Sequence, residues 1–319
     1  MQSTSSTVVI LGTGGTIAGT SANAADNVGY TAAQIGIGAL VQAVPALAGV
    51  PLESEQVAQV DSKDMTHAVW LALAQRVAHH LARAEVTGIV ITHGTDTLEE
   101  TAWFLQRVLA PIKPVVLTAA MRPASSAQAD GPQNLIDAVR VAQQPGARGV
   151  VAVLAGAVHG AFDVRKAHPY RVDAFSSGDA GPLGWVEEGV LRCLRPWPGG
   201  AALGVAGLGA DAAAWPVVEI VNSHAGARGA IVDALCAAGA HGLVVAGTGN
   251  GTVHASLLPA LQRAKERGVQ VLLATRCVEG PIVASAHALC DVGPWPPTTS
   301  LSPVKARIEL MLTLMQPQP

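Results

Sequence analysis

The sequence predicts an α/β protein with two domains: a larger N-terminal domain whose mostly parallel sheet carries helices on both faces, and a smaller C-terminal α/β domain. Three observations predict this fold. Short continuous apolar runs alternate with amphipathic segments, a pattern typical of buried parallel strands joined by helices. A segment rich in proline, glycine and alanine interrupts the alternation. The chain has 319 residues, 50% of them hydrophobic and 13% charged, which is enough to bury two cores.

The N-terminal domain is expected to span residues 1–195. Its predicted strands are apolar runs bounded by glycine, proline or polar residues, at 7–11, 88–92, 114–118 and 149–154. Apolar residues at helical spacing predict helices at 68–81 and 98–109. The proline-rich segment 196–215 is predicted to be a linker. The C-terminal domain, 216–319, then repeats the alternation, with strands at 217–221, 242–246 and 269–274 and helices at 255–267 and 303–315.

The charge distribution excludes several classes of partner. The formal net charge is −3 and no run of Lys and Arg occurs, so we expect no nucleic-acid partner. The first basic residue is Lys63, and a secretory signal begins with basic residues. The uncharged stretch 27–52 contains Pro45 and Pro51 and is a poor membrane helix. We therefore predict a protein that does not bind membranes and acts in the cytoplasm, or in the periplasm if a signal peptide has been removed.

The four cysteines, at 193, 236, 277 and 290, lie far apart and form no CxxC pair. They do not have the spacing of a zinc site. We interpret them as buried free thiols, and no metal site is predicted.

The first polar cluster, residues 12–19, follows the first predicted strand. Its glycines fit part of a dinucleotide fingerprint, but Ile17 stands where the third glycine belongs, and no acid follows at the spacing that ribose recognition needs. Glycines also permit close backbone approach, so that N–H groups can face a developing oxyanion beside the Thr16 hydroxyl. A plain glycine-rich turn is the alternative.

The second cluster, residues 91–100, follows the strand at 88–92. Thr95 or Asp96 would serve as the N-cap of a helix starting near Thr97. Capping does not explain why three threonines and His93 gather at one strand end. The functional interpretation places Thr95 in the site as a hydroxyl and Asp96 as an anchor for a cationic substrate group.

Basic residues accompany two further segments. Ser62 or Asp64 would cap the helix at 68–81, whereas Lys63 between them suggests a site for an anion. Arg165 and Lys166 lie in an otherwise apolar region, where an exposed pair is the simplest interpretation. Threonine is a weak nucleophile unless a partner activates it, so a threonine nucleophile here requires help from lysine, tyrosine or a carboxylate.

Taken together, these segments resemble the bacterial L-asparaginases. The resemblance rests on residues 13–18 (TGGTIA), 93–100 (HGTDTLEE), 120–123 (AMRP), 130–135 (DGPQNL) and 247–251 (GTGNG), in this order over nearly the whole chain. It implies hydrolysis of L-asparagine to L-aspartate and ammonia, with some activity on glutamine, by a homotetramer built as a dimer of intimate dimers. No metal or organic cofactor is implied.

The resemblance assigns the catalytic roles to five residues. Thr16 matches the nucleophilic threonine, which forms a β-aspartyl ester, and Tyr30 matches the tyrosine that hydrogen-bonds its hydroxyl. Thr95, Asp96 and Lys166 match the second group, in which lysine, assisted by aspartate, polarises the threonine and the water that resolves the ester.

The remaining assignments concern substrate binding. The N–H groups of Gly15 and Thr95 would hold the oxyanion, Ser62 the α-carboxylate, and Asp96 the α-ammonium. Ala120 lies where the backbone meets the leaving amide, and Asn250 would reach the site from the partner chain. Segment 20–29 is expected to close over the substrate as a lid.

Two positions depart from the better-known secreted members. Lys63 replaces a glutamine, and we hypothesise that it pairs with the substrate α-carboxylate. The interface glutamate of those members falls near His287 here, the nearest acid being Glu279. A glutaminase-asparaginase of broad specificity, a nicotinamide-dependent oxidoreductase built on residues 12–19, and a non-catalytic binding protein remain alternatives.

Overall fold

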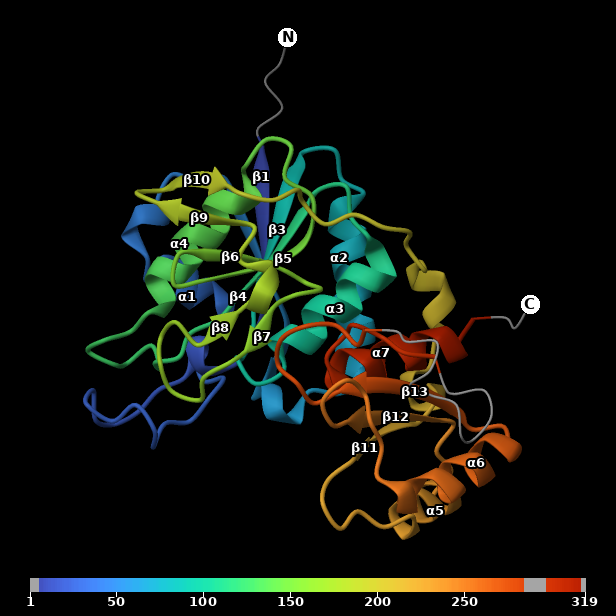
Figure 1. The fold of residues 1–319 in the computed structure, drawn as a ribbon. Helices are drawn as coiled ribbons and strands as arrows, with labels where there is room; N and C mark the ends of the chain where they lie inside the picture. The colour runs from blue at the N-terminus through green and yellow to red at the C-terminus, as the bar shows by residue number, and fades with distance from the viewer. Residues whose placement is uncertain (1–5, 284–296, 317–319) are drawn as a thin grey trace. The chain divides into compact units, whose positions relative to one another are not determined.

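The computed structural model describes residues 6–283 and 297–316. Two compact units are present, Met1–Ala206 and Gly207–Pro319, each an α/β structure with its own sheet (Figure 1). The division falls inside the segment predicted as a linker, which here contains two short 3₁₀ helices, η5 (Val205–Leu208) and η6 (Ala212–Ala214). The predicted fold class, with a large mostly parallel sheet followed by a small parallel one, is confirmed.

The first unit contains an eight-stranded sheet in the order β10-β9-β6-β5-β4-β3-β1-β2. Five strands are parallel: β1 (Thr7–Gly14), β2 (Leu52–Val60), β3 (Val86–Thr92), β4 (Pro114–Thr118) and β5 (Gly149–Leu154). The other three extend the sheet antiparallel: β6 (Ala157–Gly160), β9 (Gly184–Glu187) and β10 (Val190–Cys193). The parallel strands place the loops that follow them at one edge of the sheet.

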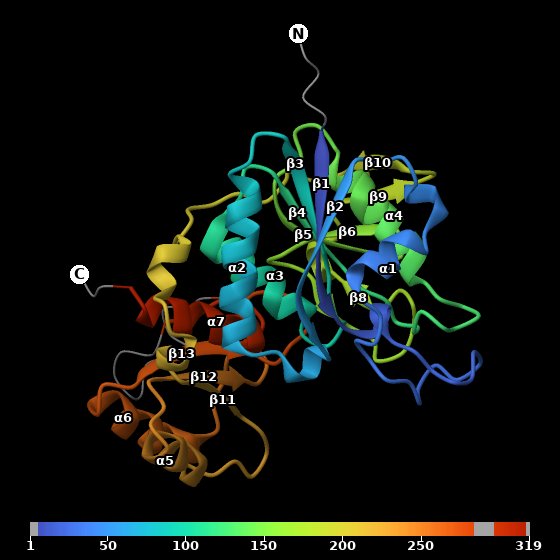
Figure 2. The same cartoon turned by 180° about the vertical axis from the view of Figure 1, so that it is seen from behind.

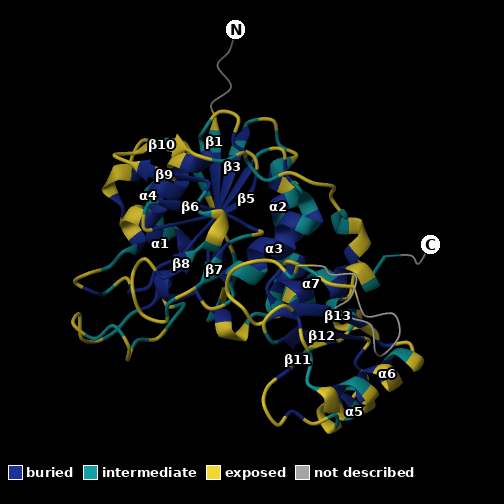
Figure 3. Ribbon diagram, in the orientation of Figure 1, coloured by how far each residue is buried: buried dark blue, intermediate teal, exposed yellow. Residues whose placement is uncertain are grey.

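Helices cover both faces of this sheet, α2 (His67–Leu81) and α3 (Leu98–Leu109) on one side and α1 (Ile37–Gln42) and α4 (Gly131–Ala142) on the other (Figures 1 and 2). Successive side chains of β1 point to opposite faces, and Val8 and Ile10 pack with Leu135 of α4 in one core. The central strands β1, β3, β4, β5 and β6 are buried over nearly their whole length, while the outer sides of the helices are exposed (Figure 3).

Several elements of this unit were not predicted, among them helices α1 and α4 and the outer strands of the sheet. Strand β2, which was not predicted, alternates half-buried and exposed residues and carries Glu53 and Glu55, so it lacks the apolar run of a central strand. Strand β1 extends to Gly14, beyond the predicted end at Leu11. The short antiparallel strands were also not predicted.

A separate two-stranded ribbon follows β6. Strand β7 (Arg165–Lys166) pairs antiparallel with β8 (Phe175–Ser176), with Lys166 opposite Phe175. We call residues 165–176 the β7–β8 hairpin. Three further 3₁₀ turns in this unit are η2 (Pro45–Leu47), η3 (Ser62–Asp64) and η4 (Gly178–Ala180).

The second unit is a three-stranded parallel sheet of β11 (Val218–Asn222), β12 (Gly242–Gly247) and β13 (Gln270–Thr275). Helices α5 (Ala230–Ala237) and α6 (Leu258–Glu266) share a core with its strands, and α7 (Pro303–Leu314) also contacts the sheet. The helix predicted at 255–267 begins as a 3₁₀ turn, η7 (Ala255–Leu257), before α6. Among the residues described, no helix combines the length and apolar character needed to cross a bilayer.

Candidate active site

Close backbone contacts bring the polar clusters at 12–19 and 91–100 together with Ser62 at the ends of β1 and β3. A Cβ added to Gly15, whose φ is +81°, would lie 2.3 Å from the Cα of Gly94. A Cβ on Gly94 would lie 2.4 Å from the Ser62 hydroxyl oxygen. No residue larger than glycine fits at either position without movement of the backbone or of Ser62. These glycines therefore hold the loops after β1, β2 and β3 against one another.

The Thr16 hydroxyl is hydrogen-bonded to the Tyr30 hydroxyl, with 2.6 Å between the two oxygens. Thr16 is buried in η1 (Thr16–Ala18), immediately after β1. The chain folds back so that Tyr30 lies beside Thr16, because Thr20 and Thr31 form an antiparallel bridge with reciprocal backbone hydrogen bonds of 2.9 Å. The loop closed by that bridge corresponds to the predicted lid segment.

The Thr95 hydroxyl belongs to a second hydrogen-bonded group. The Lys166 ammonium donates to Thr95 Oγ1 at 2.8 Å and to Asp96 Oδ1 at 2.6 Å. Lys166 is half-buried in β7, where its backbone N–H donates to a Glu99 carboxylate oxygen at 3.2 Å. The capping interpretation of Asp96 is wrong, since Thr97 is the N-cap of α3 and no side chain caps that helix. Lys166 is likewise not part of an exposed pair.

Ser62 joins the same loops. Its buried hydroxyl accepts the Asp96 N–H at 3.2 Å, and its carbonyl accepts the Thr97 hydroxyl at 2.8 Å. It does not cap α2, because Thr66 does so through the Val69 N–H.

The neighbouring Lys63 is exposed. Its ammonium pairs with Asp64, which raises the pKa of Lys63, and lies 3.9 Å from Asp61. In this structure the Lys63 ammonium therefore pairs with acids of its own turn.

Ala120 lies fully buried just after β4. The turn that contains it is held by Asp130, whose carboxylate accepts the N–H groups of Met121 and Arg122 at 2.9 Å each, and by Asn134, which donates to the Ala119 carbonyl at 2.9 Å. Sequence reasoning assigned no role to Asp130 or Asn134, although both belong to the motif at 130–135.

His93 is also part of this region and was not predicted as a site residue. It is fully buried, its Nδ1 lies 2.7 Å from the Gly94 carbonyl oxygen, and its Nε2 lies 2.9 Å from the Thr101 hydroxyl. Burial lowers the pKa of the imidazole to about 4, so the ring is neutral near pH 7. The sequence feature that could have identified His93 as a site residue is its position in the polar cluster at 91–100.

The residues predicted in the second unit have separate surroundings. The Asn250 side-chain amide exchanges two hydrogen bonds with the backbone of Val283, at 2.9 and 2.7 Å. Glu279 is exposed, and His287 lies outside the described residues. The reach of Asn250 to a partner chain remains a prediction.

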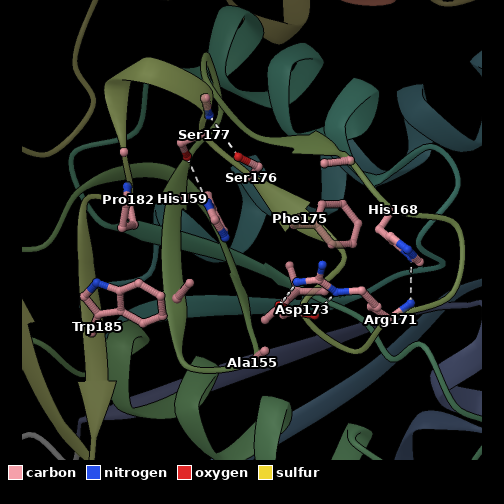
Figure 4. Close-up of a pocket in the computed structure, with 15 residues that line it drawn as sticks. Ala155, His159, His168, Arg171, Asp173, Phe175, Ser176, Ser177, Pro182 and Trp185 are labelled. Carbon is pink, nitrogen blue, oxygen red and sulfur yellow. Dashed lines mark hydrogen bonds and ion pairs between the residues drawn. The ribbon is translucent and has the colours of Figure 1, made fainter. Parts of the chain in front are cut away.

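A cavity of about 410 Å³ lies beside the β7–β8 hairpin (Figure 4). Its buried residues His159 and Ser177 are hydrogen-bonded at 2.8 Å. The carboxylate of Asp173 accepts two hydrogen bonds from Arg171, so its charge is already neutralised. The combination of two threonine hydroxyls with a lysine that the sequence predicted lies outside this cavity, at Thr16, Thr95 and Lys166.

The turn after β1 does not have the geometry of a dinucleotide-binding fingerprint. Gly15 leads into a 3₁₀ turn of only three residues, η1, whereas a dinucleotide fingerprint opens a full helix whose N-terminus faces the pyrophosphate. Among residues 6–283 and 297–316, no three His, Cys, Asp or Glu side chains are grouped to hold a metal ion. The prediction that the cysteine thiols are buried is wrong for the three described ones, since Cys193 and Cys277 are exposed and Cys236 is half-buried.

Comparison with known proteins places these motifs in one family. Residues 7–198 match the family model "Asparaginase, N-terminal", and residues 217–319 match "Glutaminase/Asparaginase C-terminal domain". A glutaminase-asparaginase of Pseudomonas fluorescens biotype A is 39% identical over 315 residues, covering 98% of this chain and 87% of that protein. A probable periplasmic L-asparaginase of Haemophilus influenzae is 36% identical over 312 residues, covering 97% and 88%.

A solved structure agrees with this placement. The crystal structure of a probable cytoplasmic L-asparaginase from Campylobacter jejuni superposes with a TM-score of 0.90 at 36% identity, covering 98% of this chain and 96% of that one. Both halves of the chain and its complete fold thus match, and the chain belongs to the L-asparaginase/glutaminase family of amidohydrolases.

Proposed function

We propose that this enzyme hydrolyses L-asparagine to L-aspartate and ammonia, with minor activity on L-glutamine. The observation that carries the proposal is the pairing of two buried threonine hydroxyls with different activators at adjacent strand ends: Thr16 with Tyr30, and Thr95 with Lys166 and Asp96. A covalent route that forms and then hydrolyses an ester needs a nucleophile and a separate means of activating water.

In the first step the Thr16 oxygen attacks the side-chain amide carbon of asparagine. Its proton passes to the leaving nitrogen by way of the Tyr30 hydroxyl, the C–N bond breaks, and ammonia leaves behind a β-aspartyl ester. The Gly15 and Thr95 N–H groups stabilise the oxyanion, and each such donor typically contributes about 3–4 kcal/mol.

In the second step water attacks the ester carbonyl and the Thr16 hydroxyl is regenerated. Lys166 donates hydrogen bonds to Thr95 and Asp96, and this group polarises the attacking water. No metal or organic cofactor takes part in either step.

The substrate's charged groups are bound at the side of the site near Ser62. The Ser62 hydroxyl binds the α-carboxylate, Asp96 binds the α-ammonium, and the backbone at Ala120 meets the amide. When the substrate binds, the Lys63 ammonium leaves Asp64 and pairs with the substrate α-carboxylate. A Lys63→Ala enzyme with an unchanged KM for asparagine would remove Lys63 from this set.

The active enzyme is a homotetramer, a dimer of intimate dimers, in which Asn250 completes the partner's site. We place it in the cytoplasm, which agrees with the name of the Campylobacter jejuni relative. A broader glutaminase-asparaginase specificity is the second candidate, favoured by the Pseudomonas fluorescens relative.

The test is ammonia release from asparagine and glutamine measured side by side, with Thr16→Ala as control. Asparagine should be the better substrate and Thr16→Ala should be inactive. Equal turnover of the two amides would favour the broader specificity, and no turnover of either by the wild type would overturn the proposal.

A further inference from the structure

The peptide group between Gly94 and Thr95 has two functional ends. Its N–H belongs to Thr95 and is one of the two oxyanion donors in the function proposed above. Its carbonyl belongs to Gly94, and the oxygen lies 2.7 Å from Nδ1 of His93. The same peptide thus has a buried histidine at one end and the reaction centre at the other.

The hydrogen-bond partners determine where the His93 proton is. A carbonyl oxygen only accepts, so Nδ1 carries the hydrogen. The Trp70 indole only donates, at 2.8 Å, to the Thr101 hydroxyl, whose own hydrogen is left for Nε2 at 2.9 Å. Because burial keeps the ring neutral, the chain runs in one direction, from Trp70 through Thr101 and His93 to Gly94.

This chain of hydrogen bonds is rigidly held. Trp70 comes from α2, Thr101 from α3 and His93 from the end of β3, and all three are buried. The Trp70 ring stacks on Phe104 with 4.9 Å between centroids. Gly94 itself has Gly15 on one side and Ser62 on the other, so its peptide plane has little freedom to rotate.

A hydrogen bond accepted by a peptide carbonyl shifts electron density toward the oxygen and makes the N–H of the same peptide a stronger donor, since linked hydrogen bonds polarise one another. A donor fixed before the reaction also costs no reorganisation when charge develops.

We propose that His93 is a positioning residue for the hydrolysis: its Nδ1–H fixes and polarises the Gly94–Thr95 peptide so that the Thr95 N–H stabilises the oxyanion. This inference rests on the proposed function. It assigns a role to a buried histidine that does not touch the substrate.

Two substitutions test the two ring nitrogens of His93 separately. In His93→Asn the side-chain amide nitrogen occupies the Nδ1 position and still donates to Gly94. In His93→Gln the amide occupies the Nε2 position, keeps the Thr101 contact and loses the Gly94 contact. Loss of a complete oxyanion donor costs about 10²–10³ in kcat; weakening one should lower kcat about tenfold in His93→Gln, while His93→Asn should stay within about threefold.

The control measurements separate positioning from folding. KM for asparagine should be equal in the two variants, because the bound substrate has a neutral amide and the oxyanion forms only after binding. Equal melting temperatures would show that the two variants are folded to the same extent. Equal kcat in the two variants, or the larger loss in His93→Asn, would overturn the proposal. Thr101→Val is the second variant if either histidine variant fails to fold; it leaves the Gly94 contact in place, so it should lower kcat less than tenfold, and a larger loss with an unchanged melting temperature would count against the proposal.

A readout independent of turnover is ¹⁵N NMR of the imidazole in the wild-type enzyme, assigned with His93→Gln. We expect the neutral Nδ1–H tautomer, without titration across the range of about pH 5–8 where free histidine changes charge. An Nε2–H tautomer would overturn the proposal even in an active enzyme. If the wild type releases no ammonia while Nδ1–H is observed, the proposed function fails but the hydrogen bond stands.

Discussion

The two threonine hydroxyls of the site differ in what activates them. Thr16 and Thr95 are both buried and both follow parallel, neighbouring strands. The Thr16 hydroxyl is hydrogen-bonded to the phenol of Tyr30. Tyr30 belongs to a loop that reaches into solvent, where Val28 is 76% exposed. Thr95 bonds an ammonium group that is itself paired with a carboxylate.

This difference indicates a division of labour between the two hydroxyls. A phenol that can donate or accept suits a proton that moves out and back, as nucleophilic attack requires. A fixed ammonium–carboxylate pair suits the stabilisation of charge on an attacking oxygen. Thr16 therefore fits the covalent step and Thr95 the hydrolytic step, and each prediction below tests one side of this division.

The largest expected effects come from the hydroxyls themselves. Thr16→Ala should lower kcat by about 10⁴ or more, since residues that act as a unit are lost together, and it should form no covalent adduct with asparagine. Thr95→Ala should lower kcat by about 10³ and still form the adduct, because attack precedes water activation. Ammonia release and intact-protein mass spectrometry after rapid quenching measure both. A covalent adduct formed by Thr16→Ala would contradict the division of labour between the two hydroxyls.

The next effect concerns the charge beside Thr95. Lys166→Met should lower kcat by about 10²–10³, the range of a lost acid–base group, and the adduct should accumulate in quenched samples. Lys113→Met is the matched control, because that ammonium bonds the carbonyls of Leu81 and Arg83 instead. It should lower the melting temperature and leave kcat unchanged. If Lys166→Met accumulates no adduct, the lysine belongs to the first step.

A smaller effect is expected on the Thr16 side. Tyr30→Phe keeps the ring and removes the hydroxyl that bonds Thr16, so kcat should fall about 10- to 100-fold with little change in the Kd for aspartate. Stopped-flow measurement of the first turnover should show the loss in the ester-forming step. A loss confined to ester hydrolysis would show that Tyr30 serves Thr95.

Much of the fold was predictable because it rests on local patterns. The apolar run at 88–92 and the helix at 98–109 have strong periodic signals, and both are observed, as β3 and α3. Strand β2 was not predictable in the same way, because its sequence becomes a strand only by pairing with β1. The paired residues, such as Val8 and Leu52, lie 44 positions apart in the chain.

The residues of the candidate site were identified through motifs, but their partners depend on the fold. Nothing local in the sequence connects Lys166 with Thr95, 71 positions away, or indicates that Asp96 bonds Lys166 instead of capping α3. His93 was missed for a related reason. Its role depends on Trp70 and Thr101, which the packing of two helices brings to it.

The smallest expected effect tests how Tyr30 is held. The Asp26 carboxylate accepts the N–H groups of Val28 and Gly29 at 2.9 and 2.8 Å, and these bonds, chiefly that from Gly29, lower the pKa of Asp26 below 3.8. Asp26→Ala should lower kcat/KM about three- to fivefold, the scale of one lost hydrogen bond, whereas Asp26→Asn keeps the acceptor and should stay near wild type.

The pH dependence of this effect has a defined sign. A depressed carboxyl pKa means that the turn is stabilised above about pH 3.8 and weakened as pH falls through the lowered pKa. Limited proteolysis within residues 20–29 should therefore speed up on acidification in the wild type and change less in Asp26→Asn. Unchanged kcat/KM in Asp26→Ala would mean that the Thr20–Thr31 bridge alone positions Tyr30, so that the Thr16 side is as firmly held as the Thr95 side.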